Sequence, residues 1–138
     1  MSEHRVSVKW ARNSTDFGYK NYNRDHVWRF DSGVEVPASA APAYLGNPQR
    51  VDPEAAFVAA LSSCHMLTFL ALASNKGFVV DSYEDNAVGH LEKNANGKLA
   101  ITHVELHPLP TVVPSSRRRR TSIGCMTRHT ANALSLTR

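Results

Sequence analysis

The 138-residue sequence has only two cysteines, Cys64 and Cys125, and its longest apolar stretch is interrupted. That stretch, residues 51–73, contains serines, a histidine and a threonine, which argues against a membrane span. No apolar segment of the signal-peptide type follows Met1. These absences predict a soluble cytoplasmic protein with reduced thiols, no structural disulfide and no membrane partner.

Excess charge of one sign is confined to one short segment. The formal net charge is +4, and residues 117–120 are four consecutive arginines, so removing them leaves zero. No aromatic residues are interleaved with these arginines, so we expect a solvated tail rather than a nucleic-acid partner. With 42% hydrophobic and 20% charged residues, the remainder has the composition of a single globular domain.

The order of hydrophobic patterns predicts an α+β fold. Alternating apolar and polar residues indicate strands, whereas Asp52 as a cap, Pro53 in the first turn and Gly77 as a stop delimit one long helix. Trp10, Trp28 and Phe30 are assigned to the core. The predicted elements are strands at residues 5–11, 26–30, 34–36, 87–93 and 98–106, a short strand or connector at 78–83, and a helix from 53 to about 76.

The predicted helix is apolar on nearly every face, with Cys64 near its middle and Glu54 in its first turn. A helix that is hydrophobic all round is normally buried all round. In so short a chain, this predicts that a sheet and a partner subunit together enclose it.

Three separate segments carry a family resemblance. Asp52-Pro53-Glu54 is followed after ten positions by Ser63-Cys64-His65, and the hairpin AVGHLEKNANGKLAITHVELHP comes next along the chain. The N-terminal segment NYNRDHVWRFDSG adds Arg24. Together they resemble the OsmC/Ohr family of thiol peroxidases over residues 5–108. The resemblance implies an antiparallel sheet wrapped on a central buried helix, in an intertwined homodimer.

The resemblance also implies a chemistry and its residues. Cys64 would be the peroxidatic thiolate, Arg24 its activator and Glu54 the partner of the arginine. Only the thiolate attacks a peroxide, and an arginine cannot lose its charge. The substrate would be an organic hydroperoxide, an external thiol would act as reductant, and no metal or organic cofactor would be needed.

One geometric constraint applies to Glu54 and Cys64. Ten residues of straight helix span about 15 Å, too far for one guanidinium to contact both. The helix therefore begins after Glu54 or kinks, or one partner comes from another subunit. Spacing alone favours structural roles, with Glu54 at the helix dipole and Cys64 as core filler, and the resemblance favours catalysis.

Residues 109–138 depart from the family. The family's His-Asp-Glu-Ala-His and Cys-Phe-Ile-Ala-Asn-Ser segments are missing, but codons for this tail, read two bases later, are compatible with both. We hypothesise that the tail is a frameshifted reading that starts near residues 109–113. The family's resolving thiol would then be absent, and nothing around Cys125 positions it as a substitute.

Two further interpretations stay open. His65, His103 and His107 could suggest a metal, but adjacent Cys64 and His65 point about 100° apart on a helix and no fourth ligand has suitable spacing, so no metal is expected. His65 could line a peroxide pocket or simply pack. The alternative function is a non-catalytic remnant of the family fold that binds small apolar molecules.

Overall fold

The computed structural model describes residues 1–113 and 131–132. It divides into two compact units, Met1–Ala56 and Phe57–Arg138, which are treated separately below. Cys125 and the four arginines at 117–120 lie outside the described residues.

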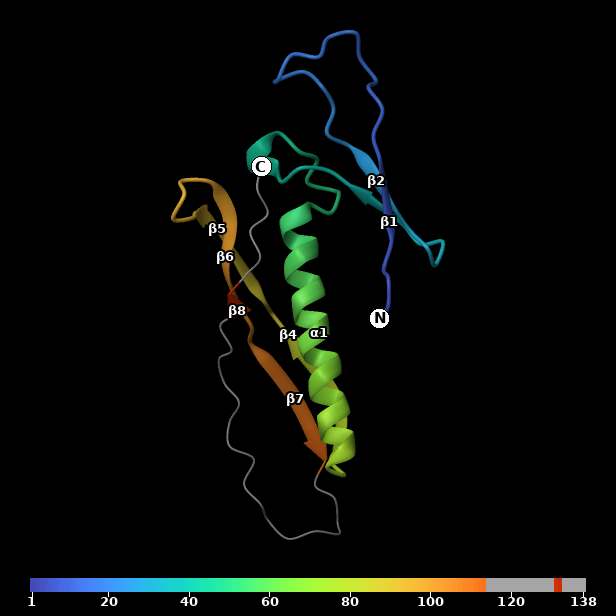
Figure 1. The fold of residues 1–138 in the computed structure, drawn as a ribbon, viewed down its shortest axis with the longest axis vertical. Coiled ribbons are helices and arrows are strands. Elements are labelled where there is room, and N and C mark those ends of the chain that lie inside the picture. Colours follow the sequence, from blue (N-terminus) through green and yellow to red (C-terminus); the bar gives the residue numbers. More distant parts are fainter. Residues whose placement is uncertain (114–130, 133–138) are drawn as a thin grey trace. The chain divides into compact units, whose positions relative to one another are not determined.

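The first unit contains a three-stranded antiparallel sheet in the order β1-β2-β3 (Figure 1). Its strands are β1 (Val6–Lys9), β2 (His26–Phe30) and β3 (Glu35–Ala38), followed by the 3₁₀ helix η1 (Pro42–Tyr44). The predicted hairpin between β2 and β3 is confirmed. Gly33 turns the chain with φ +84°, a left-handed conformation that favours glycine, and its N–H donates to the Phe30 carbonyl at 2.9 Å.

The assignment of all three aromatic residues to the core is wrong for two of them. Trp10 and Phe30 keep 42% and 38% of their surface exposed, whereas Trp28 is half-buried. Phe30 pairs with Val6 of the edge strand β1, whose four residues are all exposed, so the sheet buries little at that end. The small side chains Ala38 and Ser39 are instead the fully buried residues of this unit.

Helix α1 (Pro53–Asn75) runs across the boundary between the units. The predicted cap is confirmed, since the Ala55 N–H donates to Oδ1 of Asp52 at 2.8 Å. Gly77 ends the helix at φ +75°, and the Phe78 N–H donates to the Ala73 carbonyl at 2.9 Å. By length and mean hydropathy alone α1 could cross a membrane, a test that the core helix of a soluble protein also meets.

The second unit places antiparallel strand pairs beside α1. Strand β4 (Val79–Asp85) pairs with β7 (Pro108–Val113), and β5 (Val88–Lys93) pairs with β6 (Leu99–Glu105), which also pairs with β8 (Ala131–Asn132). The predicted hairpin at residues 87–106 and the α+β class are confirmed. Strand β7 was not predicted, because Pro108 and Pro110 are residues that normally argue against a strand. This strand extends the described fold to Val113.

The core of this unit lies between α1 and the β5–β6 pair. Ile101, Val104 and Leu106 are buried, and Phe57, Val58 and Leu61 of α1 pack against them. Gly89 allows the close approach, because a Cβ built there would lie 2.4 Å from Cγ2 of Val58.

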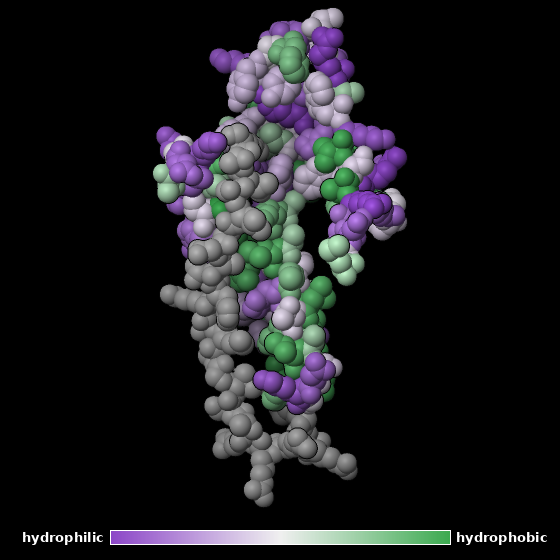
Figure 2. Space-filling model, in the orientation of Figure 1, coloured by the Kyte–Doolittle hydropathy of each residue, from purple (hydrophilic) through white to green (hydrophobic). Residues whose placement is uncertain are grey.

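The single chain does not bury the helix all round, and the predicted enclosure by a sheet together with a partner subunit stays a prediction. Ala73 is the buried residue of α1, whereas Leu67 and Leu72 keep 62% and 51% of their surface exposed. Figure 2 shows hydrophobic side chains uncovered along this part of the molecule. The sheet strands pack against one side of the helix, so its other apolar side faces outward.

Candidate active site

Cys64 is an exposed free thiol on α1. Its carbonyl accepts a hydrogen bond from Oγ1 of Thr68, one turn further along, at 2.9 Å. The role of core filler is therefore wrong for Cys64 in the single chain. An exposed thiol is open to a small substrate, as peroxide chemistry requires.

The helix turn that carries Cys64 is fastened to strand β4 on both sides of the cysteine. Nδ1 of His65 and the hydroxyl of Tyr83 share a hydrogen bond of 2.8 Å. Oγ of Ser62 donates to Oδ2 of Asp85 at 2.5 Å, and the Phe69 ring lies 5.6 Å from that of Tyr83. These contacts set the rotation of α1 and therefore the direction in which Cys64 points.

Tyr83 and Asp85 were not identified from the sequence, because the predicted strand ended at residue 83 and its alternation was weak. Burial raises the pKa of Tyr83, and the nearby negative charge of Asp85 raises it further. Tyr83 therefore stays protonated well into the alkaline range. His65, predicted either to line a pocket or to pack, contacts Tyr83 and lies half-buried.

Glu54 occupies the first turn of α1 and is half-buried. Because the helix begins at Pro53 and continues without interruption to Asn75, the alternative that it begins after Glu54 is wrong. Ten helical residues separate Glu54 from Cys64, about 15 Å along a straight helix. One guanidinium therefore does not bridge the two side chains along this helix.

Arg24 lies in the loop before β2, and its guanidinium is held by that loop. Nη1 donates to the Tyr22 carbonyl at 2.8 Å and Nη2 to the Tyr19 carbonyl at 2.5 Å. The guanidinium carbon also lies 4.1 Å from the Tyr22 ring centroid, a cation–π distance. Arg24 belongs to the first unit and Cys64 to the second, so neither unit by itself sets the distance between them.

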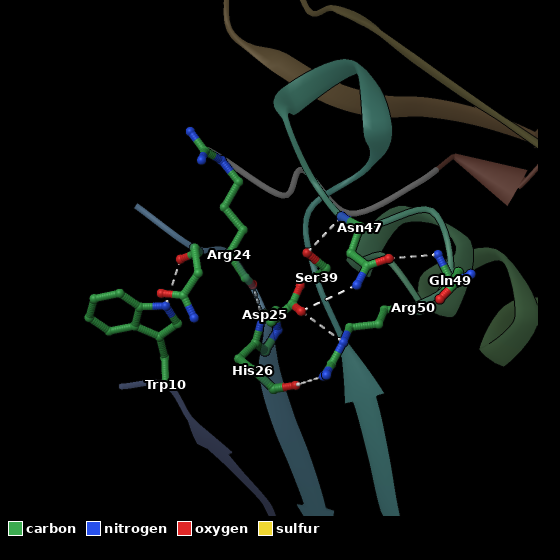
Figure 3. Close-up of polar contacts among 9 residues, drawn as sticks. Trp10, Arg24, Asp25, His26, Ser39, Asn47, Gln49 and Arg50 are labelled. Atoms are coloured by element: carbon green, nitrogen blue, oxygen red, sulfur yellow. Dashed lines mark hydrogen bonds and ion pairs between the residues drawn. The ribbon is translucent and has the colours of Figure 1, made fainter. Parts of the chain in front are cut away.

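The chain on both sides of Arg24 is anchored by polar contacts (Figure 3). The indole N–H of Trp10 donates to the Asn23 carbonyl at 2.8 Å. On the other side, Oδ2 of Asp25 lies 3.0 Å from Nε of Arg50 and 3.3 Å from Nδ2 of Asn47. Figure 3 shows the Arg24 side chain directed away from this Asp25–Arg50 pair, so the pair positions the backbone and leaves the Arg24 cation separate.

These anchoring residues were also not found from the sequence. Asp25 and Arg50 are 25 positions apart, and their pairing depends on the return of the chain from η1 to α1. Asn47 adds a link, because its N–H donates at 3.0 Å to Oγ of the buried Ser39. The available signal was the charged residue Asp25 next to the predicted Arg24, but the sequence did not show which residue pairs with Asp25.

A separate group of side chains could hold a metal ion. Potential ligand atoms of His90, His103 and Glu105 all lie within 4.8 Å of one another on the β5–β6 pair. His103 was considered from the sequence, whereas His90 and Glu105 were missed, because their proximity depends on strand register.

Comparison with known proteins agrees with the fold. A family model described as OsmC-like protein matches residues 46–117. The structure is similar to that of an OsmC-like protein of unknown function from Vibrio cholerae O1 biovar eltor, with a TM-score of 0.79 and 46% sequence identity. That match covers 86% of this chain and 80% of the other. No protein with a curated description matches. This chain belongs to the OsmC-like family.

Proposed function

We propose that this protein is a thiol-dependent peroxidase that reduces organic hydroperoxides at Cys64. The observation that carries the proposal is the exposed free thiol of Cys64, on a helix turn whose orientation is fixed by contacts with β4. Membership of the OsmC-like family supports it.

The reaction needs the Cys64 thiolate and no metal or organic cofactor. Sγ attacks the terminal peroxide oxygen, a sulfur–oxygen bond forms, and the oxygen–oxygen bond breaks. The alkoxide leaves and takes a proton to become the alcohol, while the sulfur is oxidised to sulfenic acid. An external thiol then condenses with the sulfenic acid to release water and form a mixed disulfide, which a second thiol reduces.

Arg24 is proposed as the cation that favours the thiolate, with Glu54 as its partner. The position of the Arg24 guanidinium is already restricted, because two carbonyls and an aromatic ring contact it. A restricted cation loses less conformational entropy when it meets a thiolate or a peroxide than a freely rotating one.

We also propose that the working form is a homodimer. The apolar side of α1 includes Leu67 and Leu72, which are more than half exposed in the single chain. Burying such a surface against a second copy would be favourable, at about 25 cal/mol per Å² of apolar area. A second copy would also remove the 15 Å constraint, because the arginine and the glutamate need not come from the same chain as the thiol.

Stopped-flow measurement with an organic hydroperoxide and excess dithiol tests the activity. Wild-type protein and Cys125→Ser should consume peroxide over many turnovers, whereas Cys64→Ser should give the uncatalysed rate. Equal rates for wild type and Cys64→Ser would overturn the proposal and leave a non-catalytic member that binds small apolar molecules. A single turnover that dithiol does not extend would also overturn it.

Sedimentation velocity tests the dimer. A species of twice the chain mass at micromolar concentration is expected, and Leu67→Glu should shift it to the monomer. A wild-type protein that stays monomeric at high concentration would contradict the dimer without affecting the test of Cys64.

A further inference from the structure

We propose that His90, His103 and Glu105 form a binding site for a divalent transition metal, with Zn²⁺ as the ion that the donor set fits. The site lies on the β5–β6 pair and does not use Cys64, so it is independent of the proposed peroxidase activity.

Strand register brings the three side chains to one face. His90 of β5 lies directly opposite His103 of β6, and Glu105 follows His103 by two residues on the same strand. Residues opposite each other on paired strands, and residues two apart on one strand, share a face. The intervening Val104 is fully buried on the other face, which fixes this orientation.

The distances between donor atoms suit a single metal ion. Nε2 of His90 and Nε2 of His103 lie 3.2 and 3.4 Å from Oε1 of Glu105. Tetrahedral zinc with bonds of about 2.0–2.1 Å separates neighbouring ligand atoms by about 3.3 Å. Each histidine nitrogen is therefore spaced from the carboxylate oxygen as two ligands of one ion are, and all three donor atoms lie within 4.8 Å of one another.

His107 offers a fourth ligand. Its Nε2 lies 3.7 Å from Oε2 of Glu105, and its Nδ1 lies 3.1 Å from the Asn86 carbonyl. A carbonyl can only accept a hydrogen bond, so Nδ1 is the donor in this contact and Nε2 is the nitrogen left to bind a metal. Metal-binding histidines usually donate the N–H of one ring nitrogen to a carbonyl or carboxylate, which orients the other nitrogen toward the metal.

An ion-pair cluster explains the arrangement less well. The His90 and His103 rings are stacked, with centroids 4.0 Å apart and planes 9° from parallel. In the part of the chain that the structure describes, the buried Nε2 of His90 has no hydrogen-bond partner despite its proximity to Glu105. Binding of one divalent cation by both rings therefore requires one ring to rotate out of the stack, because the lone pair of a ring nitrogen lies in the ring plane.

The site is accessible from solvent. The side chains of His90, His103 and Glu105 are 36%, 35% and 48% exposed, although Nε2 of His90 itself is buried. An ion can therefore reach the cluster from solvent and contacts this nitrogen when the His90 ring rotates. Imidazole with carboxylate is a donor set that suits zinc among the common metals.

Isothermal titration of Zn²⁺ into chelator-treated full-length protein tests the proposal. The Cys64→Ser/Cys125→Ser variant serves as the reference, since it excludes thiolate ligands. We expect one Zn²⁺ per chain, and His103→Gln should weaken binding at least about 100-fold. Removing a residue that only hydrogen-bonds to a metal ligand already weakens metal binding by up to about 100-fold, so removing a ligand should cost at least as much. His4→Gln, at an exposed histidine of the first unit, should bind as the reference does.

Two results would overturn the site: no zinc binding by the reference protein, or equal binding by His103→Gln and the reference. Co²⁺ absorption provides a readout that does not depend on whether the variant folds. The reference protein loaded with Co²⁺ should show visible bands of a tetrahedral or five-coordinate ion, and an octahedral aqueous spectrum would contradict the proposal.

Discussion

Cys64 and the His90–His103–Glu105 cluster show two different ways of placing reactive side chains. The neighbours of Cys64 on the helix surface include Leu61, Leu67 and Thr68, so the helix alone brings no charge to the thiol. The cluster is built from one strand pair, in which cross-strand register and a two-residue spacing bring the donors together. A helix-borne nucleophile depends on distant parts of the fold or on another chain, whereas a hairpin can assemble a polar site by itself.

The largest expected effect concerns the packing that supports the cluster. Ile101→Ala should lower the free energy of unfolding by about 2–5 kcal/mol, because Ile101 is almost fully buried against α1. Urea unfolding followed by circular dichroism measures this loss.

Leu67→Ala is the matched control on the side of α1 that the sheet leaves exposed. It should change stability by at most about 0.5 kcal/mol at concentrations where the protein is monomeric. A loss as large as that of Ile101→Ala under those conditions would mean that both sides of the helix are covered within one chain. A loss that grows with protein concentration would support the dimer.

The next prediction tests the dependence of Cys64 on a distant cation. An unactivated thiol with a pKa near 8.5 is only about 3% thiolate at pH 7, so full activation is worth about 30-fold in rate. Arg24→Gln should therefore slow single-turnover oxidation of Cys64 by up to about 30-fold at pH 7, and the loss should shrink as the pH rises.

Arg29→Gln provides the control, because Arg29 is an exposed residue of the same unit that pairs with Glu35. It should leave the rate unchanged. An equal reduction in both variants would show a general effect of charge and remove Arg24 from the mechanism.

A smaller effect is expected at Gly89, which lies beside His90. Gly89→Ala should destabilise the protein by about 1–3 kcal/mol, because the new methyl group meets the stiff side chain of Val58. In a Val58→Ala background the added methyl has room, so the cost should fall. Additive losses in the double variant would show that the two residues are not in contact.

The smallest effect concerns Tyr83, beside the turn that carries Cys64. Its raised pKa means that the unfolded chain ionises this tyrosine first, so stability should fall as the pH rises above the ordinary tyrosine value of ~10. Tyr83→Phe should remove this alkaline loss and the last part of the phenolate absorbance titration.

Asp85→Asn should lower the Tyr83 pKa, but only in part, since burial is the larger cause of the shift. If the absorbance that Tyr83→Phe loses lies near pH ~10, the ordinary tyrosine value, and not at the end of the titration, Tyr83 is not buried in solution.

Local chemistry made much of this protein predictable. Asp52, Pro53 and Gly77 define the ends of α1 because capping and backbone conformation act over a few residues. The two hairpins follow from alternation and turn residues for the same reason. Strand β7 escaped prediction because its prolines removed the usual signal, and it forms because β4 provides a partner.

For the candidate sites, the sequence by itself proposed Cys64, Arg24 and Glu54, because the motifs that carry them can be recognised from the order of residues, and their roles stay predictions. Only the tertiary structure decided that Cys64 is exposed, that Asp25 and Arg50 anchor the loop of Arg24, and that His90 and Glu105 join His103. These outcomes depend on strand register and on which side of a helix is covered. Both arise from contacts between residues far apart in the chain, which local sequence patterns do not specify.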